Sequence, residues 1–371
     1  MLEQRAAASR HTATTVTVFD PARASEAQWN DVLAYWRLRN EEDIPEEPQP
    51  SDVEIRRNVL QERDRPLYNI QRLLAQDAQG RLLGSLNMSY RREGTPDHAT
   101  FAPFVDVWGG VLRAHRRQGV ASRLLHGLLA TMEAQGHTIA TLRAHLPEGH
   151  AFLQAIGATE KHRSVENRMA FADLDWAALA RWQAEAFSPA RGLRAEIHIG
   201  RVPRDRLATL IEPMSVLLDD APTSGLERAP LRYELDDYLA WYAEIDRRGG
   251  EHFLVLLRDG EDIAAMCDAS WNQLYPDRMF QRLTAVARNW RGKGLAKGVK
   301  AAMLRLVHER HPELTMAVTS NAEINAPMLA INHQLGYVPY RNDGVYQIGT
   351  ESLKAFLATR PLASQQQEAQ R

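Results

Sequence analysis

The chain has 371 residues, which is too long for one ordinary hydrophobic core, so its length predicts two domains. The composition is 44% hydrophobic and 25% charged, as in soluble globular proteins, and the net charge of −2 argues against nucleic acid as the main partner. No apolar run approaches the roughly 20 residues needed to span a membrane. Cys267 is the only cysteine, which excludes an intrachain disulfide and predicts a buried structural thiol in a cytoplasmic protein.

The first half of the chain is predicted to alternate strands and helices after a disordered arm at residues 1–14, which lacks the apolar stretch of a secretory signal. Strands are expected at residues 15–19, 69–76, 82–90, 101–112, 138–143 and 167–174. Helices are expected at residues 24–39, 52–63 with Ser51 as N-cap, 120–135 ended by Gly136, and 149–156. The pair Gly109-Gly110 within a strand indicates a bulge or a close approach of another group.

The same order of elements repeats in the second half. Strands are expected at residues 194–200, 252–258, 263–271, 280–287, 314–319 and 337–346, and helices at 204–218, 235–247, 295–310 and 326–335. We therefore expect an N-terminal domain at 15–175, a connecting helix and linker at 176–192, a C-terminal domain at 193–360 and a disordered tail at 361–371.

Two segments share the pattern Arg-x-x-Gly-x-Ala, and each lies between a predicted strand and an amphipathic helix. A pyrophosphate needs N–H donors and positive charge, and a glycine turn into a helix N-terminus supplies both. One copy is weak evidence, because basic loops before helices are commonly only solvated, whereas two equivalent copies are stronger. The candidate phosphate-binding residues are Arg116, Arg117, Gln118, Gly119, Val120 and Ala121, and Arg291, Gly292, Lys293, Gly294, Leu295 and Ala296.

This strand–turn–helix resembles the acetyl-CoA motif of the GNAT superfamily of N-acetyltransferases, Arg/Gln-x-x-Gly-x-Gly/Ala. In the second half, residues 319–337 resemble the last strand-to-helix segment of the family, in which an Asn contacts the pantetheine arm and Leu-Gly-aromatic ends the helix. Asn325 falls on that Asn position, and Asn321 precedes it in the same segment. The tandem layout is similar to that of mycothiol synthase, without assigning that substrate.

The resemblance implies an α/β fold of two tandem GNAT-like domains, each a mostly antiparallel mixed sheet flanked by helices. It implies acetyl-CoA as co-substrate and direct attack of a small-molecule amine on the thioester. No metal is expected, because His115, His308, His311 and His333 show no metal-ligand spacing with a carboxylate or cysteine partner. It assigns neither a nucleic-acid nor a membrane partner and leaves the oligomeric state open. The backbone groups expected to pair with the pantetheine arm belong to Val111 and Leu112 in the first copy and to Ala285 and Val286 in the second.

The sequence departs from the family pattern at the proton donor. Many members place a Tyr four residues before the glycine that ends the last helix, where this chain has Leu153 and Asn332. Tyr337 and Tyr340 are close enough in sequence to substitute, although an aromatic residue after that glycine is normally in the core. The first copy also has Leu146 where the second has Asn325, so we expect the chemistry in the second copy.

Asp106 lies between Val105 and Val107 and so faces away from that apolar side, as a general base or a structural hydrogen-bond partner would. The catalytic candidates are therefore Asn332, Tyr337, Tyr340 and Asp106. The acidic segments Glu41–Glu47 and Asp219-Asp220 lie where the family frames its acceptor site; they favour a cationic amine, or are only solvated loops. The missing Tyr keeps open a non-catalytic alternative, an acyl-CoA-binding or amine-sequestering protein.

Overall fold

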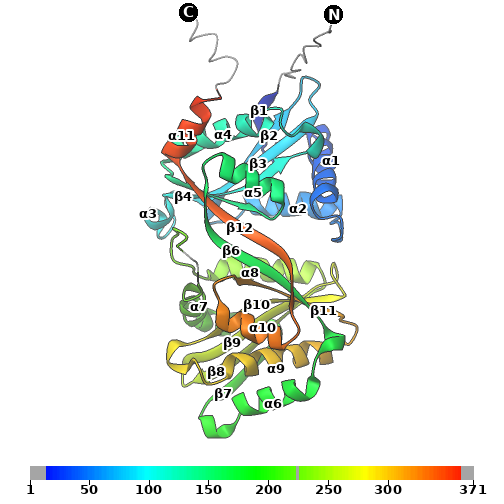
Figure 1. Ribbon diagram of the computed structural model, residues 1–371, viewed down its shortest axis with the longest axis vertical. Helices are drawn as coiled ribbons and strands as arrows, with labels where there is room; N and C mark the ends of the chain where they lie inside the picture. Colours follow the sequence, from blue (N-terminus) through cyan, green and yellow to red (C-terminus); the bar gives the residue numbers. More distant parts are fainter. Residues whose placement is uncertain (1–13, 223–224, 361–371) are drawn as a thin grey trace, which may run out of the picture. The chain divides into compact units, whose positions relative to one another are not determined.

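The computed structural model describes residues 14–222 and 225–360 (Figure 1). The expected tail and, except for Thr14, the expected N-terminal arm lie outside these residues. Within them, twelve strands follow one hydrogen-bonded order, β1-β2-β3-β4-β5-β12-β6-β11-β10-β9-β8-β7. This mixed sheet flanked by helices confirms the predicted fold class. Of the described helices, none is long and apolar enough to cross a membrane.

The elements have the following bounds. The strands are β1 (Thr15–Val18), β2 (Tyr68–Gln76), β3 (Leu82–Arg91), β4 (Phe104–Val111), β5 (Ile139–Ala144), β6 (Thr159–Ala170), β7 (Arg194–Gly200), β8 (Glu251–Asp259), β9 (Asp262–Trp271), β10 (Arg278–Val286), β11 (Met316–Ala322) and β12 (Val338–Gly349). The helices are α1 (Glu26–Asp43), α2 (Asp52–Arg63), α3 (His98–Phe101), α4 (Val120–Gln135), α5 (Pro147–Ala155), α6 (Trp176–Ala186), α7 (Arg204–Asp219), α8 (Leu235–Arg247), α9 (Leu295–Arg310), α10 (Ala326–Gln334) and α11 (Thr350–Ala358).

The chain forms two compact units, and the boundaries between them fall within β6 and β12. Unit 1 contains the residues up to Lys161 and those from Val345 onward, and unit 2 contains His162–Gly344. The end of β12 contributes Tyr346 and Ile348 to the core of unit 1, whereas most of β6 lies in unit 2 and pairs with β11 (Figure 1). The ranges expected from sequence, 15–175 and 193–360, instead assign each strand to the copy that precedes it.

In unit 1 the strands β1 to β4 are antiparallel, and β4 and β5 are parallel. Helix α4 packs one stripe of its side chains on one face of this sheet, as its i, i+4 apolar spacing predicts. Helices α1 and α2 form a second core around Trp29, which is 1% exposed. Each buried Leu or Met of these cores contributes about 1.5–3 kcal/mol.

Unit 2 repeats this arrangement. The strands β7 to β10 are antiparallel, β10 and β11 are parallel, and β6 closes the sheet antiparallel to β11. The helices α6 and α9 share one core with one face of the sheet, and α7 and α8 form the core on the other face. In both units the two strands of the parallel pair are thus connected by a basic turn and a helix.

Most element predictions are confirmed, including α2 with Ser51 as its N-cap and α4 with Gly136 at its end. Three were wrong. The helix expected to end at residue 39 continues to Asp43, because Arg39 and Asp43 pair one turn apart. The strand expected at 167–174 is β6, which starts earlier, at Thr159. Its first half is polar and lacks an apolar pattern, so this start was not predicted. Helix α11 was not predicted, although Leu353 and Leu357 form its buried stripe.

Candidate functional site

Each Arg-x-x-Gly-x-Ala segment joins the end of a strand to the first turn of a helix, β4 to α4 and β10 to α9. Gly119 (φ 81°) and Gly294 (φ 79°) occupy the N-cap positions in the left-handed region, which glycine adopts without strain. No side chain caps the first-turn N–H groups of either described helix. These N–H groups and the positive end of the helix dipole therefore form a cradle suited to an anion.

The leading arginine of the first segment is held by the protein itself. Arg116 donates a hydrogen bond from Nε to the carbonyl oxygen of Val111 (3.1 Å) and pairs with Asp43 (3.4 Å). The next arginine, Arg117, is exposed and has a positive φ of 62°. Arg116 therefore fixes the turn, and Arg117 is the cation that this turn presents to solvent.

The second segment has the same brace with one more arginine. Arg291 donates from Nε to the carbonyl oxygen of Val286 (3.2 Å) and pairs with Asp220, which also binds Arg288. These two guanidinium groups, Arg288 foremost, lower the pKa of Asp220. Lys293 remains exposed, with its Nζ 4.2 Å from the centre of the Trp290 ring. The cradle of α9 thus keeps a solvent-exposed ammonium group beside it.

The parallel strands separate just before each turn. Strand β4 pairs with β5 only over Phe104–Val107, and β10 pairs with β11 only over Arg278–Gln281. Val111, Ala285 and Val286 lie beyond these pairs, so the edge of their strand is not covered by the parallel partner. Leu112 differs from expectation: its side chain is buried, and its N–H donates to Leu83 of β3 (2.9 Å).

In unit 1 the end of β4 is occupied by side chains of α1. Tyr35 donates its hydroxyl proton to the carbonyl oxygen of Gly110 (2.8 Å). The guanidinium of Arg39 donates to the carbonyl oxygen of Val111 (3.3 Å) and lies against Gly110, where a Cβ atom would be 2.5 Å from it. The glycine pair of this strand therefore accommodates close approach rather than a bulge, because the pairing of β3 and β4 runs without a shift.

The bulge occurs in unit 2 instead. The pairing of β10 with β9 shifts between Gln281 and Thr284, so that Arg282 and Leu283 together lie opposite the single residue Asp268. A bulge re-aims side chains, and both residues project toward the face covered by α7 and α8. This change occurs directly after the last residue that pairs with β11.

Three asparagines lie in the segment formed by β11 and α10: Asn321 in the strand, Asn325 at the N-cap of the helix and Asn332 within the helix. Asn325 is the N-cap of α10 and accepts from the Met328 N–H (3.4 Å). Asn332 is 2% exposed and donates from Nδ2 to Oδ1 of Asn321. The first copy has Leu146 at the corresponding N-cap of α5, without a side-chain cap. The polar cluster is therefore a property of unit 2.

The two tyrosine candidates lie in different environments. Tyr337 is 3% exposed and donates its hydroxyl proton to Oε1 of Gln281 (3.1 Å), and burial raises its pKa strongly. Tyr340 is 40% exposed, with the guanidinium carbon of Arg168 3.3 Å from the centre of its ring. Burial favours a packing role for Tyr337, whereas Tyr340 is accessible.

Asp106 faces away from the buried Val105 and Val107, as its position in the strand predicts. Its side chain is 60% exposed and lies 3.7 Å from Nη1 of Arg143. Desolvation by the surrounding protein raises the pKa of Asp106, and Arg143 opposes this effect. Both roles considered for this carboxylate stay open, but it belongs to unit 1.

The acidic segments are bound by the protein's own donors. In unit 1 Glu42 accepts from the Arg113 N–H (2.8 Å). In unit 2 Asp219 accepts from Arg228 (2.8 Å) and Asp220 binds the two turn arginines. These three carboxylates therefore brace loops and turns and do not form a cluster open to a cationic amine.

Unit 2 contains a fully buried polar network that was not predicted from the sequence. His252 lies 2.9 Å from Oδ1 of Asp268 through Nε2 and 2.8 Å from the hydroxyl of Tyr242 through Nδ1. The same hydroxyl accepts from the Val202 N–H (3.1 Å). His252 and Asp268 are both 0% exposed. Both residues lie in otherwise apolar strands. The one available signal was that the first copy also has a polar residue, Asn87, at the position that corresponds to Asp268.

A second buried network of unit 2 lies on the opposite face of the sheet, where Cys267 of β9 and Gln281 of β10 point. Gln281 accepts from Lys300 and Tyr337 through Oε1 and donates from Nε2 to Sγ of Cys267 (3.2 Å), which also contacts Thr284 (3.3 Å). Burial lowers the pKa of Lys300 to about 8 and raises that of the Cys267 thiol. The cysteine is buried, as predicted.

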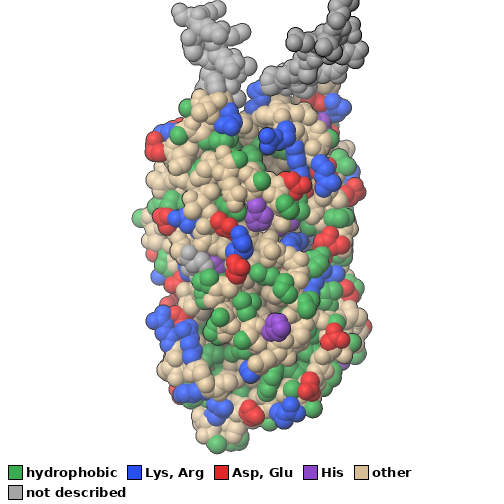
Figure 2. Space-filling view, in the orientation of Figure 1, with side chains coloured by type: hydrophobic (Ala, Val, Ile, Leu, Met, Phe, Trp, Pro, Cys, Tyr) green, Lys and Arg blue, Asp and Glu red, His purple; other side chains and the backbone are tan. Residues whose placement is uncertain are grey.

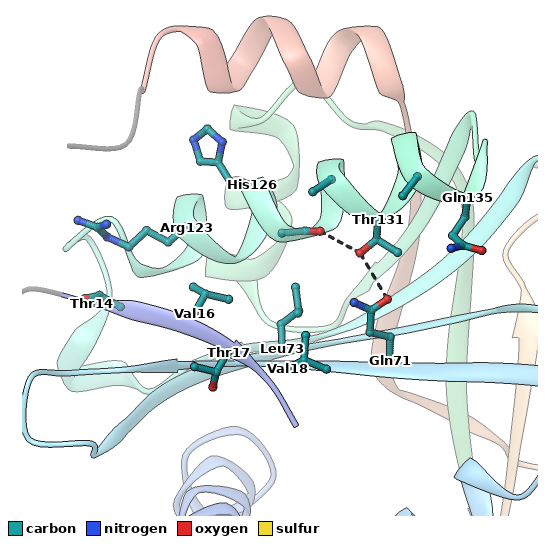
Figure 3. A pocket seen from close by; sticks show the side chains of 13 residues that line it. Thr14, Val16, Thr17, Val18, Gln71, Leu73, Arg123, His126, Thr131 and Gln135 are labelled. Carbon is teal, nitrogen blue, oxygen red and sulfur yellow. Dashed lines mark hydrogen bonds between the residues drawn. The ribbon is translucent and has the colours of Figure 1, made fainter. Parts of the chain in front are cut away.

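A cavity of about 610 Å³ lies elsewhere in unit 1, between α4 and strands β1 and β2 (Figure 3). Thr131 donates to Gly127 (3.0 Å) and contacts Gln71 (3.4 Å) in its wall. No residue that lines it is a predicted site residue. Within the described part of the chain, no group of three or more His, Cys, Asp or Glu side chains is placed to hold a metal ion.

Charged side chains of both signs are interspersed on the face of the molecule drawn in Figure 2. This agrees with the net charge of −2. A broad basic patch is the usual electrostatic footprint of a nucleic-acid interface. The face in view carries no such patch.

No family model and no curated protein matches the sequence. Solved structures do match the fold. A tandem GNAT protein from the clavulanic acid biosynthesis pathway, solved without AcCoA, superposes with a TM-score of 0.66 at 21% identity, over 91% of this chain and 99% of that one. A GCN5-related N-acetyltransferase from Sphaerobacter thermophilus matches with a TM-score of 0.58 at 13% identity, over 91% and 96% of the two chains. A GCN5-related glucosamine N-acetyltransferase region of a fungal multi-domain β-N-acetylglucosaminidase gives a TM-score of 0.60 at 13% identity, over 91% of this chain and 38% of that one. The chain therefore has the tandem GNAT fold.

Proposed function

We propose that the protein is an acetyl-CoA-dependent N-acetyltransferase whose chemistry takes place in unit 2. The observation that carries this proposal is the combination, in one unit, of the uncapped α9 N-terminus with a β10 edge that is bulged and separated from β11. A pyrophosphate fits the first and an extended pantetheine arm fits the second, because an exposed strand edge offers N–H and C=O groups to an extended partner.

The geometry of the α9 cradle suits a phosphate group. Gly292 (φ 75°) and Gly294 lie in the left-handed region, and no atom of the described protein lies within 4 Å of a Cβ built on either. The first-turn N–H groups are accessible there, and Lys293 adds a positive charge. These residues would hold the pyrophosphate, and Asn325, the N-cap of α10, would contact the pantetheine arm, with Asn321 preceding it in β11.

Unit 2 is favoured over unit 1 because Arg39 has no counterpart there. Asp43 and Asp220 both brace the leading arginine of a turn, so the residue that corresponds to Arg39 is Val216, four positions before Asp220. Val216 is 61% exposed and Arg39 lies on the β4 backbone. In unit 1 a pantetheine arm would have to displace this guanidinium.

The proposed reaction is direct acyl transfer. The acceptor nitrogen attacks the thioester carbonyl carbon, a C–N bond forms, the C–S bond breaks, and the amine proton passes to water or a base while the leaving thiolate takes up a proton. A backbone N–H at the β10 edge would stabilise the developing oxyanion. Tyr340 is the accessible candidate for proton transfer in unit 2, since Tyr337 and Asn332 are buried.

The test compares two glycines in identical positions, Gly294→Val and Gly119→Val. Both have positive φ and open space, so each change strains only the start of its helix. We expect Gly294→Val to reduce acetyl-CoA-dependent thiol release with an amine panel by at least about 100-fold, and Gly119→Val to leave it within about threefold. Calorimetric binding of acetyl-CoA without turnover by the wild type would favour the non-catalytic alternative, and no binding at all would refute both.

A further inference from the structure

Arg282 lies on β10, the strand whose edge carries the proposed pantetheine site. It belongs to the bulge of β10, directly after Gln281, the last residue that pairs with β11. Its guanidinium carbon lies 3.8 Å from the centre of the Trp241 ring of α8, on the face covered by α7 and α8. The bulge therefore turns a cation from the strand that carries the proposed pantetheine site toward a rigid aromatic surface.

The hydrogen-bonding capacity of this guanidinium is unused. Its one ion pair is with Asp268, whose Oδ2 lies 3.8 Å from Nε, and it makes no hydrogen bond to any described residue. The Arg282 side chain is 34% exposed. A guanidinium presents five N–H donors in a planar fork that matches a carboxylate or a phosphate. Arg282 is thus fixed in place, partly exposed and open to an oxyanion.

The buried network behind Arg282 explains how it is fixed. Asp268 is held by His252, and His252 by Tyr242, so the carboxylate beneath the guanidinium cannot turn away. Arg282 and His252 hold the pKa of Asp268 low, against its burial. Asp268 and His252 are positioning residues in this arrangement, because they act on Arg282.

Asp219 and Asp220, the carboxylates of unit 2 that were expected to attract a cationic amine, do not pair with Arg282. Asp219 is bound by Arg228 and by the Leu231 N–H (2.9 Å), and Asp220 is bound by Arg288 and Arg291. Neither carboxylate therefore neutralises the charge of Arg282, whose ion pair is with Asp268.

We propose that the acceptor of unit 2 is an amine that also carries an oxyanion group, a carboxylate or a phosphate, and that Arg282 binds this group while Trp241 packs beside it. This inference rests on the proposed function. It names the acceptor as an amino acid or an amino sugar phosphate rather than a polyamine or a neutral amine.

The experiment measures thiol release with matched acceptors: L-phenylalanine against phenylalaninamide and 2-phenylethylamine, and glucosamine 6-phosphate against glucosamine. We expect the anionic member of at least one set to have the higher kcat/KM by about 10–100-fold, since a charged hydrogen bond supplies that much discrimination. The pair that responds distinguishes carboxylate from phosphate. A preference for the neutral or decarboxylated members would overturn the proposal.

Three variants assign the effect to the residue. Arg282→Gln should raise KM for the anionic acceptor by about 10–100-fold with kcat within about threefold, and Arg282→Lys should restore part of the loss. Arg201→Gln is the matched control, because Arg201 also stacks on an α8 ring, Tyr242 at 5.1 Å, but has its own carboxylate, Asp246. An unchanged acceptor preference in Arg282→Gln would refute the proposal.

A binding measurement separates this proposal from the proposed function. Calorimetry with N-acetyl-L-phenylalanine, N-acetyl-2-phenylethylamine and N-acetylglucosamine 6-phosphate needs no turnover. Binding of an anionic product that is lost in Arg282→Gln supports the inference even if no amine is acetylated. Failure of acetyl-CoA to bind would refute the proposed function alone, whereas failure of both anionic products to bind would refute the role of Arg282.

Discussion

The guanidinium of Arg39 lies against the backbone of Gly110, where a Cβ atom would come within 2.5 Å of it. This contact places a charged side chain of α1 on the strand end that leads to the first basic turn, and Asp43 and the Val111 carbonyl oxygen hold it there. The two units thus share the braced turn but differ in access to the strand beside it.

The two units should differ in their ability to bind the coenzyme. The wild type should bind one acetyl-CoA in calorimetry, and Arg39→Ala should bind two, because removal of the guanidinium opens the β4 edge. Arg37→Ala is the control, since Arg37 is half-exposed and pairs with Asp52 away from the strand. Two sites in the wild type, or a single site in Arg39→Ala, would contradict the difference in access.

The local pattern predicted most of the fold, because amphipathic stripes and caps are short-range signals. Helix α2 has the predicted bounds, and Ser51 caps it through a capping box. The division of β6 and β12 between the two units could not be predicted in this way, because it depends on pairing between residues that are far apart in the sequence. The polar half of β6 also carries no apolar alternation, so its start at Thr159 was missed.

The sequence predicted only the part of the candidate site that is formed by backbone groups, the two turns before α4 and α9. Glycines before a helix identify the cradles, so Gly119 and Gly294 were found from spacing. The bulge at Arg282 arises because β9 has one residue between the two pairs that flank the bulge, whereas β3 has two residues between the equivalent pairs of unit 1. The sequence of a single strand does not show this difference. Asp268 and Lys300 were missed because each lies in an otherwise apolar run, where pattern reading assigns core.

Lys300 should make stability depend on pH in the alkaline range. Burial lowers its pKa from 10.5 to about 8 in the folded state, so between these values the unfolded chain binds more protons. The free energy of unfolding therefore gains a contribution that rises with pH through this window, by about 3 kcal/mol in total. Urea titrations from pH 7.5 to 10.5 should show this contribution in the wild type and not in Lys300→Met.

Other groups titrate in the same range, so the comparison uses the difference between wild type and variant. Lys354→Met is the control, because Lys354 is exposed and its pKa is raised by Glu133 and Glu351, not lowered. Equal pH slopes in wild type and Lys300→Met would show that Lys300 keeps its ordinary pKa in the folded protein.

The buried network behind Arg282 should be costly to interrupt. Tyr242→Phe removes the hydroxyl that accepts from the Val202 N–H and leaves both that group and Nδ1 of His252 buried without their partner. We expect the free energy of unfolding to fall by about 1–3 kcal/mol. Guanidinium denaturation monitored by far-UV circular dichroism measures this directly, and a loss below about 0.5 kcal/mol would show that the network contributes little to stability.

The close packing of α6 on α9 within unit 2 should depend on one glycine. A Cβ atom at Gly298 of α9 would lie 2.0 Å from Cβ of Ala186 in α6, and both atoms are fixed by their helices. At Gly127 of α4 the corresponding contact is Cδ1 of Leu73 at 2.5 Å, the tip of a side chain that can rotate. Alanine gains about 1 kcal/mol of helix propensity over glycine at either position. Gly298→Ala should therefore destabilise the protein by about 1–3 kcal/mol in spite of that gain, because α6 must move away, whereas Gly127→Ala should stay within about 1 kcal/mol of the wild type. Thermal and urea unfolding of the two variants measure the difference, and equal effects would show that α6 is not held by this contact.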